Sequence, residues 1–259
     1  MKAVFTCGGT GGHINPALAV ARVLLERRPD SEILFVGAED GMEATLVPRE
    51  GFRLETLQIS SYMRSLKPSA IRHNVRAALS IRRALKKADR IIRDFQPDVI
   101  LGTGGYASYP MLHEGARLGI PTAVHESNAV PGLATKMVAD KVDRILVSFA
   151  DSRSAYHDPS RVIAVGMPVR EEFVFTRRAD ARRALGLDEK TPMIVSAWGS
   201  LGAREMNKKI AQFMKLECGQ DCWRHIHATG SFGWRWMPDY VKEQGVELEK
   251  HPLITMQEY

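Results

Sequence analysis

Short apolar runs alternate with longer amphipathic stretches along the first 165 residues of the chain. The apolar runs have the length of buried strands, and the stretches between them carry the spacing of helices. Strands separated by helices predict βαβ units, a parallel sheet and an α/β fold. The predicted strands are Lys2–Cys7, Glu32–Gly37, Asp98–Leu101, Thr122–His125, Arg144–Ser148 and Arg161–Val165, and the helices cover about Asn15–Arg27, residues 69–95 as one helix or two, and a segment that ends at Leu118.

The alternation is interrupted at Gly166–Arg170, a stretch that contains Gly and Pro and precedes a charged helix from about Ala179 to Leu185. A new strand–glycine–helix pattern then follows, with a strand at Met193–Ala197 and a helix at Ala203–Leu216. We therefore expect an N-terminal domain over 1–166 and a second Rossmann-like domain over 167–259. Because 93 residues are few for a doubly wound domain, we expect the second domain to be incomplete.

Three glycine loops follow predicted strands: Gly8–His13, Gly102–Tyr106 and Gly199–Gly202. Glycine lets the backbone approach an anion closely, and the N–H groups at a helix N-terminus bind phosphate. The first loop lacks the Gly-Lys-Ser/Thr of a P-loop. The second loop fits the dinucleotide fingerprint loosely, with Glu126 at a suitable distance. A nicotinamide-dependent oxidoreductase is therefore an alternative to a phosphate- or diphosphate-binding enzyme.

Two polar segments occupy the ligand-facing ends of predicted strands. His13 follows the first glycine loop, where a histidine can act as a base near neutral pH. A second strand ends in His-Glu-Ser-Asn, residues 125–128. A helix-start residue and a capped turn are the structural alternatives for these two segments. No Gly-x-Ser-x-Gly elbow accompanies them, so a hydrolase triad is unsupported.

The charge balance suggests an anionic partner. Lysine and arginine number 36 against 30 acidic residues, a net charge of +6. Residues 72–93 carry eight basic side chains, including Arg72 and Arg76, with apolar residues interleaved. A basic amphipathic helix can lie on anionic lipid. We favour a membrane surface over nucleic acid, because no aromatic platform accompanies the charges, and over a merely solvated helix face.

The cysteines are few and widely spaced. Cys7, Cys218 and Cys222 form an odd set, which suggests a reducing compartment rather than a disulfide framework. Cys218 and Cys222 precede His225 and His227, a spacing that raises the question of zinc. The segment from residue 223 to 229 alternates like a strand, however, and we expect no metal site there.

Taken together, the motifs resemble the MurG family of N-acetylglucosaminyltransferases, which convert lipid I to lipid II in peptidoglycan synthesis. The resemblance is carried, in the family's order along the chain, by Gly8–Ala19, Pro97–Tyr106, His125–Gly132, Gly166–Arg170 and Gly199–Arg204.

The resemblance implies a GT-B fold of two Rossmann-like domains and an inverting displacement. In that reaction the C4 hydroxyl of the acceptor attacks C1 of GlcNAc and UDP leaves, with no metal or cofactor required. It implies His13 as the base, with Glu126 as a competitor. The further contacts that it implies are Thr10, Gly11, Gly12 and Asn128 at the donor sugar, Arg170 and Ser200 at the donor diphosphate, and Gly104, Gly105 and Tyr106 at the acceptor diphosphate.

The same resemblance implies where the protein works. Its partners would be UDP-GlcNAc, lipid I and the anionic surface of the bacterial membrane, with no nucleic acid. The protein would be peripheral, at the cytoplasmic face. The basic helix would dock on that face through Arg82, Arg83, Lys86 and Lys87.

Two departures from the family pattern qualify the resemblance. Trp198 precedes Gly199-Ser200 where the family usually has Gly-Gly-Ser, and the family's donor-binding Ser-Arg-Ala-Gly-Ala segment is absent. The chain thus resembles roughly the first two-thirds of the enzyme. We expect this chain to be catalytically silent and to bind UDP-GlcNAc poorly. The alternative function is a non-catalytic module that binds a nucleotide sugar or the acceptor.

Overall fold

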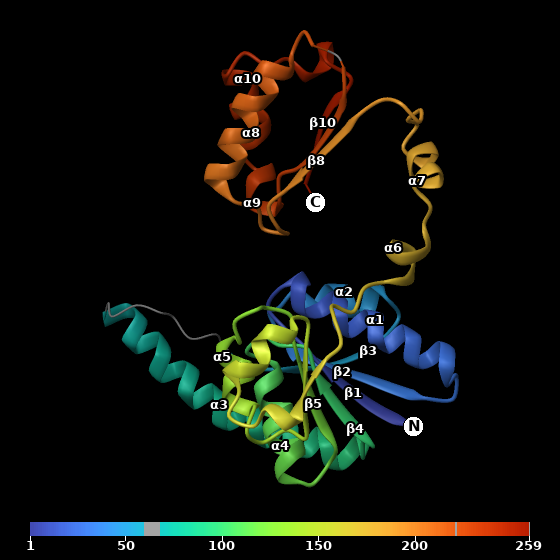
Figure 1. The fold of residues 1–259 in the computed structure, drawn as a ribbon. Coiled ribbons are helices and arrows are strands. Elements are labelled where there is room, and N and C mark those ends of the chain that lie inside the picture. The colour runs from blue at the N-terminus through green and yellow to red at the C-terminus, as the bar shows by residue number, and fades with distance from the viewer. Residues whose placement is uncertain (60–67, 221, 259) are drawn as a thin grey trace. The chain divides into compact units, whose positions relative to one another are not determined.

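The computed structural model describes residues 1–59, 68–220 and 222–258, with the backbone alone for the helical residues 68–79. The chain forms two compact units, unit 1 (Met1–Val174) and unit 2 (Phe175–Tyr259), which are described separately below (Figure 1). The division falls inside the short helix α6 (Glu171–Phe175), a little after the boundary expected at residue 166.

Unit 1 is built on a parallel seven-stranded sheet with the strand order β3-β2-β1-β4-β5-β6-β7. The chain begins at β1 in the interior of the sheet, adds strands on one side and then on the other, so the order reverses between β1 and β4. Ligands of open α/β sheets bind at such a point, outside the carboxyl ends of the strands. The strands are β1 (Lys2–Thr6), β2 (Glu32–Ala38), β3 (Arg53–Leu57), β4 (Val99–Gly102), β5 (Thr122–Glu126), β6 (Arg144–Val147) and β7 (Val162–Ala164).

Helices cover both faces of this sheet, so the central strands are buried on both sides and read as continuous apolar runs. Val4, Leu34 and Ile100 belong to the hydrophobic cluster on one face. Phe5 and Phe35 belong to the other, with their rings stacked 5.3 Å apart. The helices of unit 1 are α1 (Gly11–Arg27), α2 (Glu43–Arg49), α3 (Pro68–Phe95), α4 (Ser108–Arg117) and α5 (Leu133–Val138), with the 3-10 turns η1 (Ala150–Ala155) and η2 (Pro159–Arg161).

The predicted strands of unit 1 are confirmed within about two residues, and residues 69–95 form the single helix α3. The start of α1 differs from the prediction: the helix begins at Gly11 rather than near Asn15. Glycine is a poor helix former, which is why the sequence favours a longer loop. The first helical turn nevertheless has no intrahelical acceptor for its N–H groups, so its residues need only the correct backbone angles.

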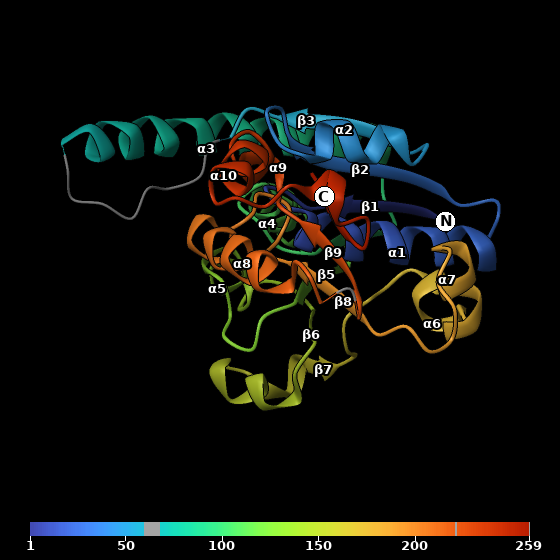
Figure 2. The ribbon, with the colours of Figure 1, turned by 90° about the horizontal axis from the view of Figure 1, so that it is seen from above.

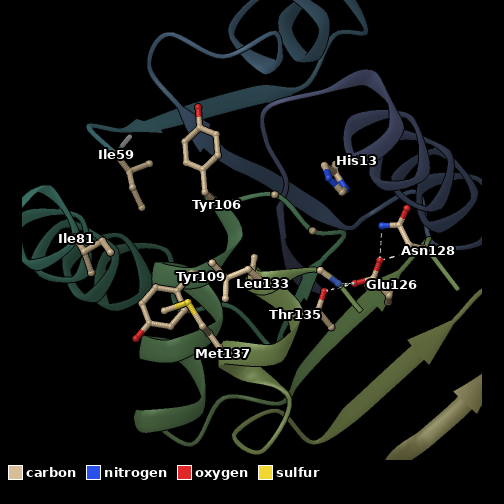
Figure 3. Close-up of a pocket in the computed structure, with 14 residues that line it drawn as sticks. His13, Ile59, Ile81, Tyr106, Tyr109, Glu126, Asn128, Leu133, Thr135 and Met137 are labelled. Carbon is tan, nitrogen blue, oxygen red and sulfur yellow. Dashed lines mark hydrogen bonds between the residues drawn. The ribbon is translucent and has the colours of Figure 1, made fainter. Parts of the chain in front are cut away.

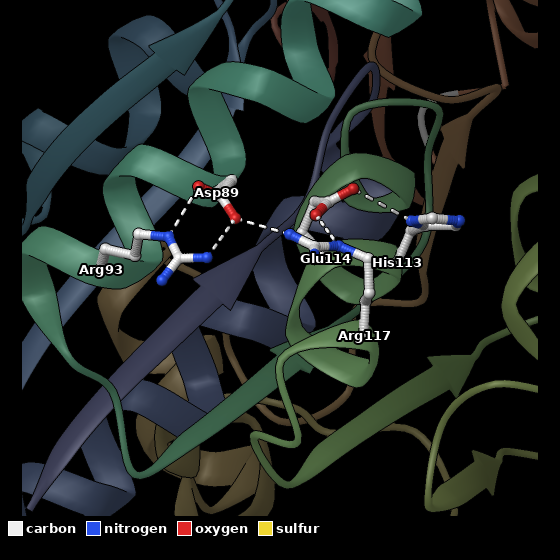
Figure 4. Close-up of polar contacts among 5 residues, drawn as sticks. All are labelled: Asp89, Arg93, His113, Glu114 and Arg117. Atoms are coloured by element: carbon white, nitrogen blue, oxygen red, sulfur yellow. Dashed lines mark hydrogen bonds and ion pairs between the residues drawn. The ribbon is translucent and has the colours of Figure 1, made fainter.

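Helix α3 extends beyond the body of unit 1 at its N-terminal end (Figures 1 and 2). Near its C-terminal end an ion network joins it to α4 (Figure 4). Arg117 of α4 donates to Asp89 and to Glu114, each at 2.6 Å, and Arg93 donates to Asp89 at 2.8 Å. His113 lies 3.3 Å from Glu114. The network therefore ties the long basic helix to the helix that follows the second glycine loop.

Unit 2 has a parallel sheet of three strands in the order β10-β9-β8. Its strands are β8 (Met193–Ala197), β9 (Arg224–Ala228) and β10 (Ile254–Gln257). Its core joins Ala211 and Met214 to Met237, Val241 and Ile254. The helices are α7 (Arg178–Ala184), α8 (Arg204–Glu217), α9 (Ser231–Trp234) and α10 (Met237–Glu243), with the turn η3 (Leu248–Lys250).

Candidate active site

A pocket of about 260 Å³ opens at the carboxyl ends of the unit 1 strands (Figure 3). It collects residues from three separate segments that the sequence singled out: the first glycine loop with the start of α1, the second glycine loop, and the loop after β5. The pocket is lined by His13, Ile59, Ile81, Gly104, Gly105, Tyr106, Tyr109, Glu126, Asn128, Gly132, Leu133, Ala134, Thr135 and Met137. Six of the sequence-predicted site residues therefore line one cavity.

The first two glycine loops pack directly against each other beside this pocket. Only glycine, which has no side chain, allows the two backbones to approach this closely. Gly104 has a φ of +99°, and a Cβ there would lie 2.7 Å from His13 Nδ1. Gly105 has a φ of +81°, and a Cβ there would lie 2.0 Å from the carbonyl oxygen of Gly8. Both positions thus need a left-handed backbone and a missing side chain. The glycines of the second loop serve this packing as well as any contact with a ligand.

The His13 ring is held by the backbone of the second loop. Its Nδ1 lies 3.1 Å from the carbonyl oxygen of Thr103, and Thr103 Oγ1 donates in return to the His13 carbonyl at 2.6 Å. A carbonyl oxygen can only accept, so Nδ1 carries the proton of the neutral ring. Nε2 is then left with the lone pair, in a residue that lines the pocket. This is the arrangement of a histidine prepared to accept a proton.

Glu126 is engaged differently, because both of its carboxylate oxygens already accept hydrogen bonds. Oε1 accepts from the backbone N–H and the side-chain amide of Asn128, at 2.9 and 2.7 Å. Oε2 accepts from the Gly132 N–H at 2.9 Å and from Thr135 Oγ1 at 2.6 Å. Burial raises the pKa of Glu126, but these hydrogen bonds outweigh it and hold the pKa below its ordinary value. Such a carboxylate orders the loop after β5 and is a weak base.

The remaining wall of the pocket is apolar. Ile59, Ile81, Tyr109, Leu133 and Met137 come from four segments and face the polar residues across the cavity (Figure 3). Leu133 and Met137 remain partly exposed to solvent. The pocket therefore combines a polar half, suited to a sugar or diphosphate, with an apolar half that continues to the surface.

Tyr106 stands between the two halves. Burial raises the pKa of its hydroxyl, and the negative charges of Glu43 and Asp40 raise that pKa further. The Tyr106 side chain therefore remains a neutral hydrogen-bond donor at neutral pH.

Thr10, Gly11 and Gly12 lie at the N-terminus of α1, next to His13, and do not themselves line the pocket. The Thr10 side chain does not cap the helix, and its first turn contains no acidic residue. The first N–H groups of a helix have no intrahelical partner and favour negative charge. This helix start therefore suits an anion beside the pocket.

The two predicted donor-diphosphate residues fall in different units. Arg170 lies in unit 1, where it pairs with Glu172 at 3.2 Å and its guanidinium lies 5.4 Å from the centre of the Phe173 ring. Ser200 lies in unit 2, in the loop between β8 and α8, where its carbonyl accepts from the Ser231 N–H at 2.9 Å. Neither residue joins the pocket of unit 1.

The basic cluster of α3, which we define as Arg82, Arg83, Lys86 and Lys87, is exposed. The neighbouring Ala84 and Ala88 are buried, so the cluster lies on the outer side of the helix. Ile81, at the start of the same segment, lines the pocket. The side chains of Arg72 and Arg76 lie outside the described residues. Within the described residues, none of the helices contains an apolar stretch that could span a lipid bilayer.

The histidines after Cys222 take part in a buried network rather than a metal cluster. Ser196 Oγ lies 2.8 Å from His225 Nε2 and 2.7 Å from His227 Nδ1. His225 Nδ1 lies 2.7 Å from Glu217 Oε2. Among the described residues, no group of three or more His, Cys, Asp or Glu side chains is placed to hold a metal ion.

Sequence reasoning passed over two buried polar residues. Glu43, at the start of α2, is fully buried behind the first glycine loop. Asn207 is fully buried in α8, and its side-chain amide donates to the Thr229 carbonyl at 2.8 Å. The available sequence signal for Glu43 is the two glycines shortly before it, Gly37 and Gly41, which both lie against its side chain in the structure.

Much of the chain is similar to known glycosyltransferases. The profile of the glycosyltransferase family 28 N-terminal domain matches residues 3–147, more than half of the chain. A protein of Caldanaerobacter subterraneus subsp. tengcongensis, named UDP-N-acetylglucosamine--N-acetylmuramyl-(pentapeptide) pyrophosphoryl-undecaprenol N-acetylglucosamine transferase, is 36% identical over 98% of this chain and 68% of its own length. This chain belongs to the MurG family of glycosyltransferases.

Further relatives place the chain within the family. A protein of the same name from Acetivibrio thermocellus is 39% identical over 89% of this chain. The chain spans 61% of the length of that relative. The crystal structure of Acinetobacter baumannii MurG matches with a TM-score of 0.63 at 22% identity, over 100% of this chain and 68% of that one. The fold is accordingly an α/β GT-B fold, and MurG membership favours transferase chemistry over the nicotinamide alternative.

Proposed function

We propose that this chain contributes to the transfer of GlcNAc from UDP-GlcNAc to the C4 hydroxyl of MurNAc in lipid I, a reaction that forms lipid II with inversion at C1. The names of the two relatives describe a transfer of N-acetylglucosamine between UDP-N-acetylglucosamine and an N-acetylmuramyl-(pentapeptide) pyrophosphoryl-undecaprenol. The observation that carries the proposal is the His13 geometry, in which Nδ1 is bound to the Thr103 carbonyl and the ring lines a pocket between two glycine loops.

In the proposed reaction the acceptor oxygen attacks C1 of GlcNAc while the C1–oxygen bond to UDP breaks. His13 Nε2 takes the proton of the attacking hydroxyl, which converts the ring to an imidazolium. The Thr103 carbonyl accepts a hydrogen bond from Nδ1–H and stabilises this cation. UDP leaves with the electron pair of the broken bond. Backbone N–H groups at a helix N-terminus can stabilise the departing diphosphate without a metal ion.

We assign acceptor binding to unit 1. The acceptor diphosphate lies against Gly104, Gly105 and Tyr106, and Tyr106 supplies a neutral hydroxyl donor. The apolar wall of the same pocket suits the first part of a polyprenyl chain, because it continues to partly exposed side chains at Leu133 and Met137. A lipid-linked sugar diphosphate needs both surfaces in one cavity.

We assign donor contacts to the start of α1, Asn128 and Arg170, which belong to unit 1, and to Ser200, which belongs to unit 2. Thr10, Gly11, Gly12 and Asn128 contact the donor sugar, and Arg170 and Ser200 contact the nucleotide diphosphate. Glu126 is a positioning residue rather than the base, because its two oxygens are occupied by Asn128, Gly132 and Thr135. It keeps Asn128 at the edge of the pocket.

We propose peripheral attachment to the anionic cytoplasmic face of the membrane through the basic cluster of α3. All four side chains of the cluster are exposed, and Ile81 of the same helix lines the pocket. Docking of this helix would bring the apolar half of the pocket to the lipid surface. Basic residues near an anionic surface contribute about 1 kcal/mol each.

Product analysis tests the function. The chain is assayed with UDP-GlcNAc and a short-chain, water-soluble analogue of lipid I, both alone and as a chimera that supplies the part of the Caldanaerobacter subterraneus relative left uncovered by the match. Formation of the disaccharide by the chimera supports the transferase. Binding of the analogue without transfer would instead favour a non-catalytic acceptor-binding module.

A further inference from the structure

The carboxylate of Glu43 lies directly behind the first glycine loop. Glu43 is the first residue of α2 and is fully buried. Its Oε2 accepts the Gly9 N–H at 3.2 Å, and its Oε1 accepts the Ala38 N–H at 2.7 Å. A buried carboxyl group is unfavourable unless its oxygens are hydrogen-bonded. The two bonds join the glycine loop after β1 to the end of β2 through one side chain.

The space for this side chain is provided by three glycines from three segments. A Cβ at Gly37 would lie 2.4 Å from Glu43 Cγ, and one at Gly41 would lie 2.3 Å from Oε2. A Cβ at Gly8 would lie 2.7 Å from Oε1. Contacts this close are not found for real side chains. The residues around Glu43 therefore form a compartment that fits one carboxylate.

The other side of the same loop faces the pocket. The Gly8 carbonyl packs against Gly105, where a Cβ would lie only 2.0 Å away, and a Cβ at Gly9 would lie 3.3 Å from the Tyr106 ring. The negative charge of Glu43 also contributes, after burial, to the raised pKa of Tyr106. Gly8 and Gly9 are thus held between a buried carboxylate and two residues that line the pocket.

We propose that Glu43 is a positioning residue that fixes Gly8 and Gly9, and through them the second glycine loop and Tyr106, in the geometry that receives the acceptor diphosphate. It acts from outside the pocket, through backbone hydrogen bonds, and touches no substrate. The consequence for diphosphate binding rests on the proposed function, whereas the effect on the loop does not.

The test compares three variants of the full chain. Glu43→Gln keeps the shape of the side chain but has one acceptor oxygen and an NH₂ group that must face one of the two N–H donors. Gly41→Ala keeps the carboxylate and displaces it, because the new Cβ would overlap Oε2. Glu39→Gln is the matched control, since Glu39 is an exposed glutamate in the same segment.

Two readouts separate positioning from a general effect on folding. Amide exchange of Gly9, followed by NMR, should accelerate about 10- to 100-fold in Glu43→Gln and in Gly41→Ala, as expected for loss of a hydrogen bond to a charged group. Binding of inorganic pyrophosphate, followed by calorimetry, should weaken about tenfold in the same two variants. The Glu39→Gln variant should match the wild type in both, and all variants are compared at temperatures below their melting transitions.

The outcomes are distinguishable. Unchanged Gly9 exchange in both variants would overturn the proposal, whatever pyrophosphate does. If Glu43→Gln fails to fold, the folded Gly41→Ala variant decides by the same exchange measurement. Pyrophosphate that does not bind the wild-type chain would count against the diphosphate site of the proposed function, while Gly9 exchange would still decide the role of Glu43.

Discussion

His13 in unit 1 and His225 in unit 2 both contact an oxygen atom through Nδ1, but they differ in the surroundings of their second nitrogen. His13 gives Nδ1 to the Thr103 carbonyl and lines a pocket. His225 gives Nδ1 to Glu217 and Nε2 to Ser196, and it is completely buried. The second arrangement has the connectivity of a hydrolase triad without access for a substrate. A histidine can act as a catalytic base only where one ring nitrogen remains accessible to a ligand. His13 of unit 1 meets this condition, and His225 of unit 2 does not.

The largest expected effect is on turnover. His13→Ala in the chimera should lower kcat about 10²- to 10⁴-fold, as is typical for loss of a general base, while leaving the melting temperature close to that of the wild type. Steady-state assays with UDP-GlcNAc and the lipid I analogue measure it. The matched Glu126→Gln variant should lose less, because the carboxylate orders a loop. If His13→Ala had the same kcat as the wild type, a residue other than His13 would be the base.

In unit 2 we expect the replacement of a histidine to lower stability rather than turnover. His225→Ala removes the contact between His225 Nδ1 and the buried Glu217 carboxylate, and loss of a hydrogen bond to a charged group costs about 1.5–3 kcal/mol. Denaturant unfolding should therefore show a large loss of stability in unit 2, whereas acceptor binding to unit 1 should persist. A variant with wild-type stability would show that the buried network is not structural.

Much of the difference between the surroundings of His13 and His225 could be predicted from the sequence, and part of it could not. The strand Met193–Ala197 and the position of His13 after a strand–glycine turn follow from local pattern, because both depend on nearby residues. The helix α2 and the edge strand β3 were missed: the first contains Pro48 and is short, and the second is only partly buried. Neither segment shows a clear helical or strand periodicity of apolar residues in the sequence.

The roles within the site needed three-dimensional contacts. The sequence identified Glu126 as a possible base but could not count the four hydrogen bonds to its carboxylate. It also could not relate Glu43 to Gly8, since the contact joins segments that are distant in the chain. The alternation of residues 223–229 did predict the strand β9, but it could not show that His225 and His227 both contact Ser196.

Acid should weaken unit 2 through His227. Burial, opposed by a hydrogen bond to the Ser196 backbone, lowers its pKa from 6.5 to about 4. The unfolded state then binds more protons between these values, so stability is fully present above pH 6.5 and falls as the pH approaches 4, by at most about 3 kcal/mol. Calorimetry across this window should show a smaller fall in His227→Gln. If the wild type and His227→Gln lost the same stability across this window, His227 would not be the group that makes unit 2 sensitive to acid.

The smallest expected effect is at the surface. Replacing one member of the basic cluster, for example Lys86→Gln, should weaken binding to anionic vesicles by about 1 kcal/mol, and added salt should weaken it further. Lys215→Gln, at an exposed lysine of α8 in unit 2, is the matched control. Vesicle sedimentation decides between them. Equal losses in the two variants, or equal binding to neutral vesicles, would show that unit 1 has no dedicated membrane face.

We propose that the pocket of unit 1, and not the buried network of Ser196, His225 and Glu217 in unit 2, receives the lipid-linked acceptor. The most direct measurement is an NMR titration of the labelled chain with the short-chain lipid I analogue, which reports on each backbone amide. We expect shifts of the backbone amide signals at Gly11, Gly12, His13, Gly104 and Gly105, with the amides of Ser196 and His225 unchanged. Shifts confined to unit 2, or none at the two glycine loops of unit 1, would contradict it.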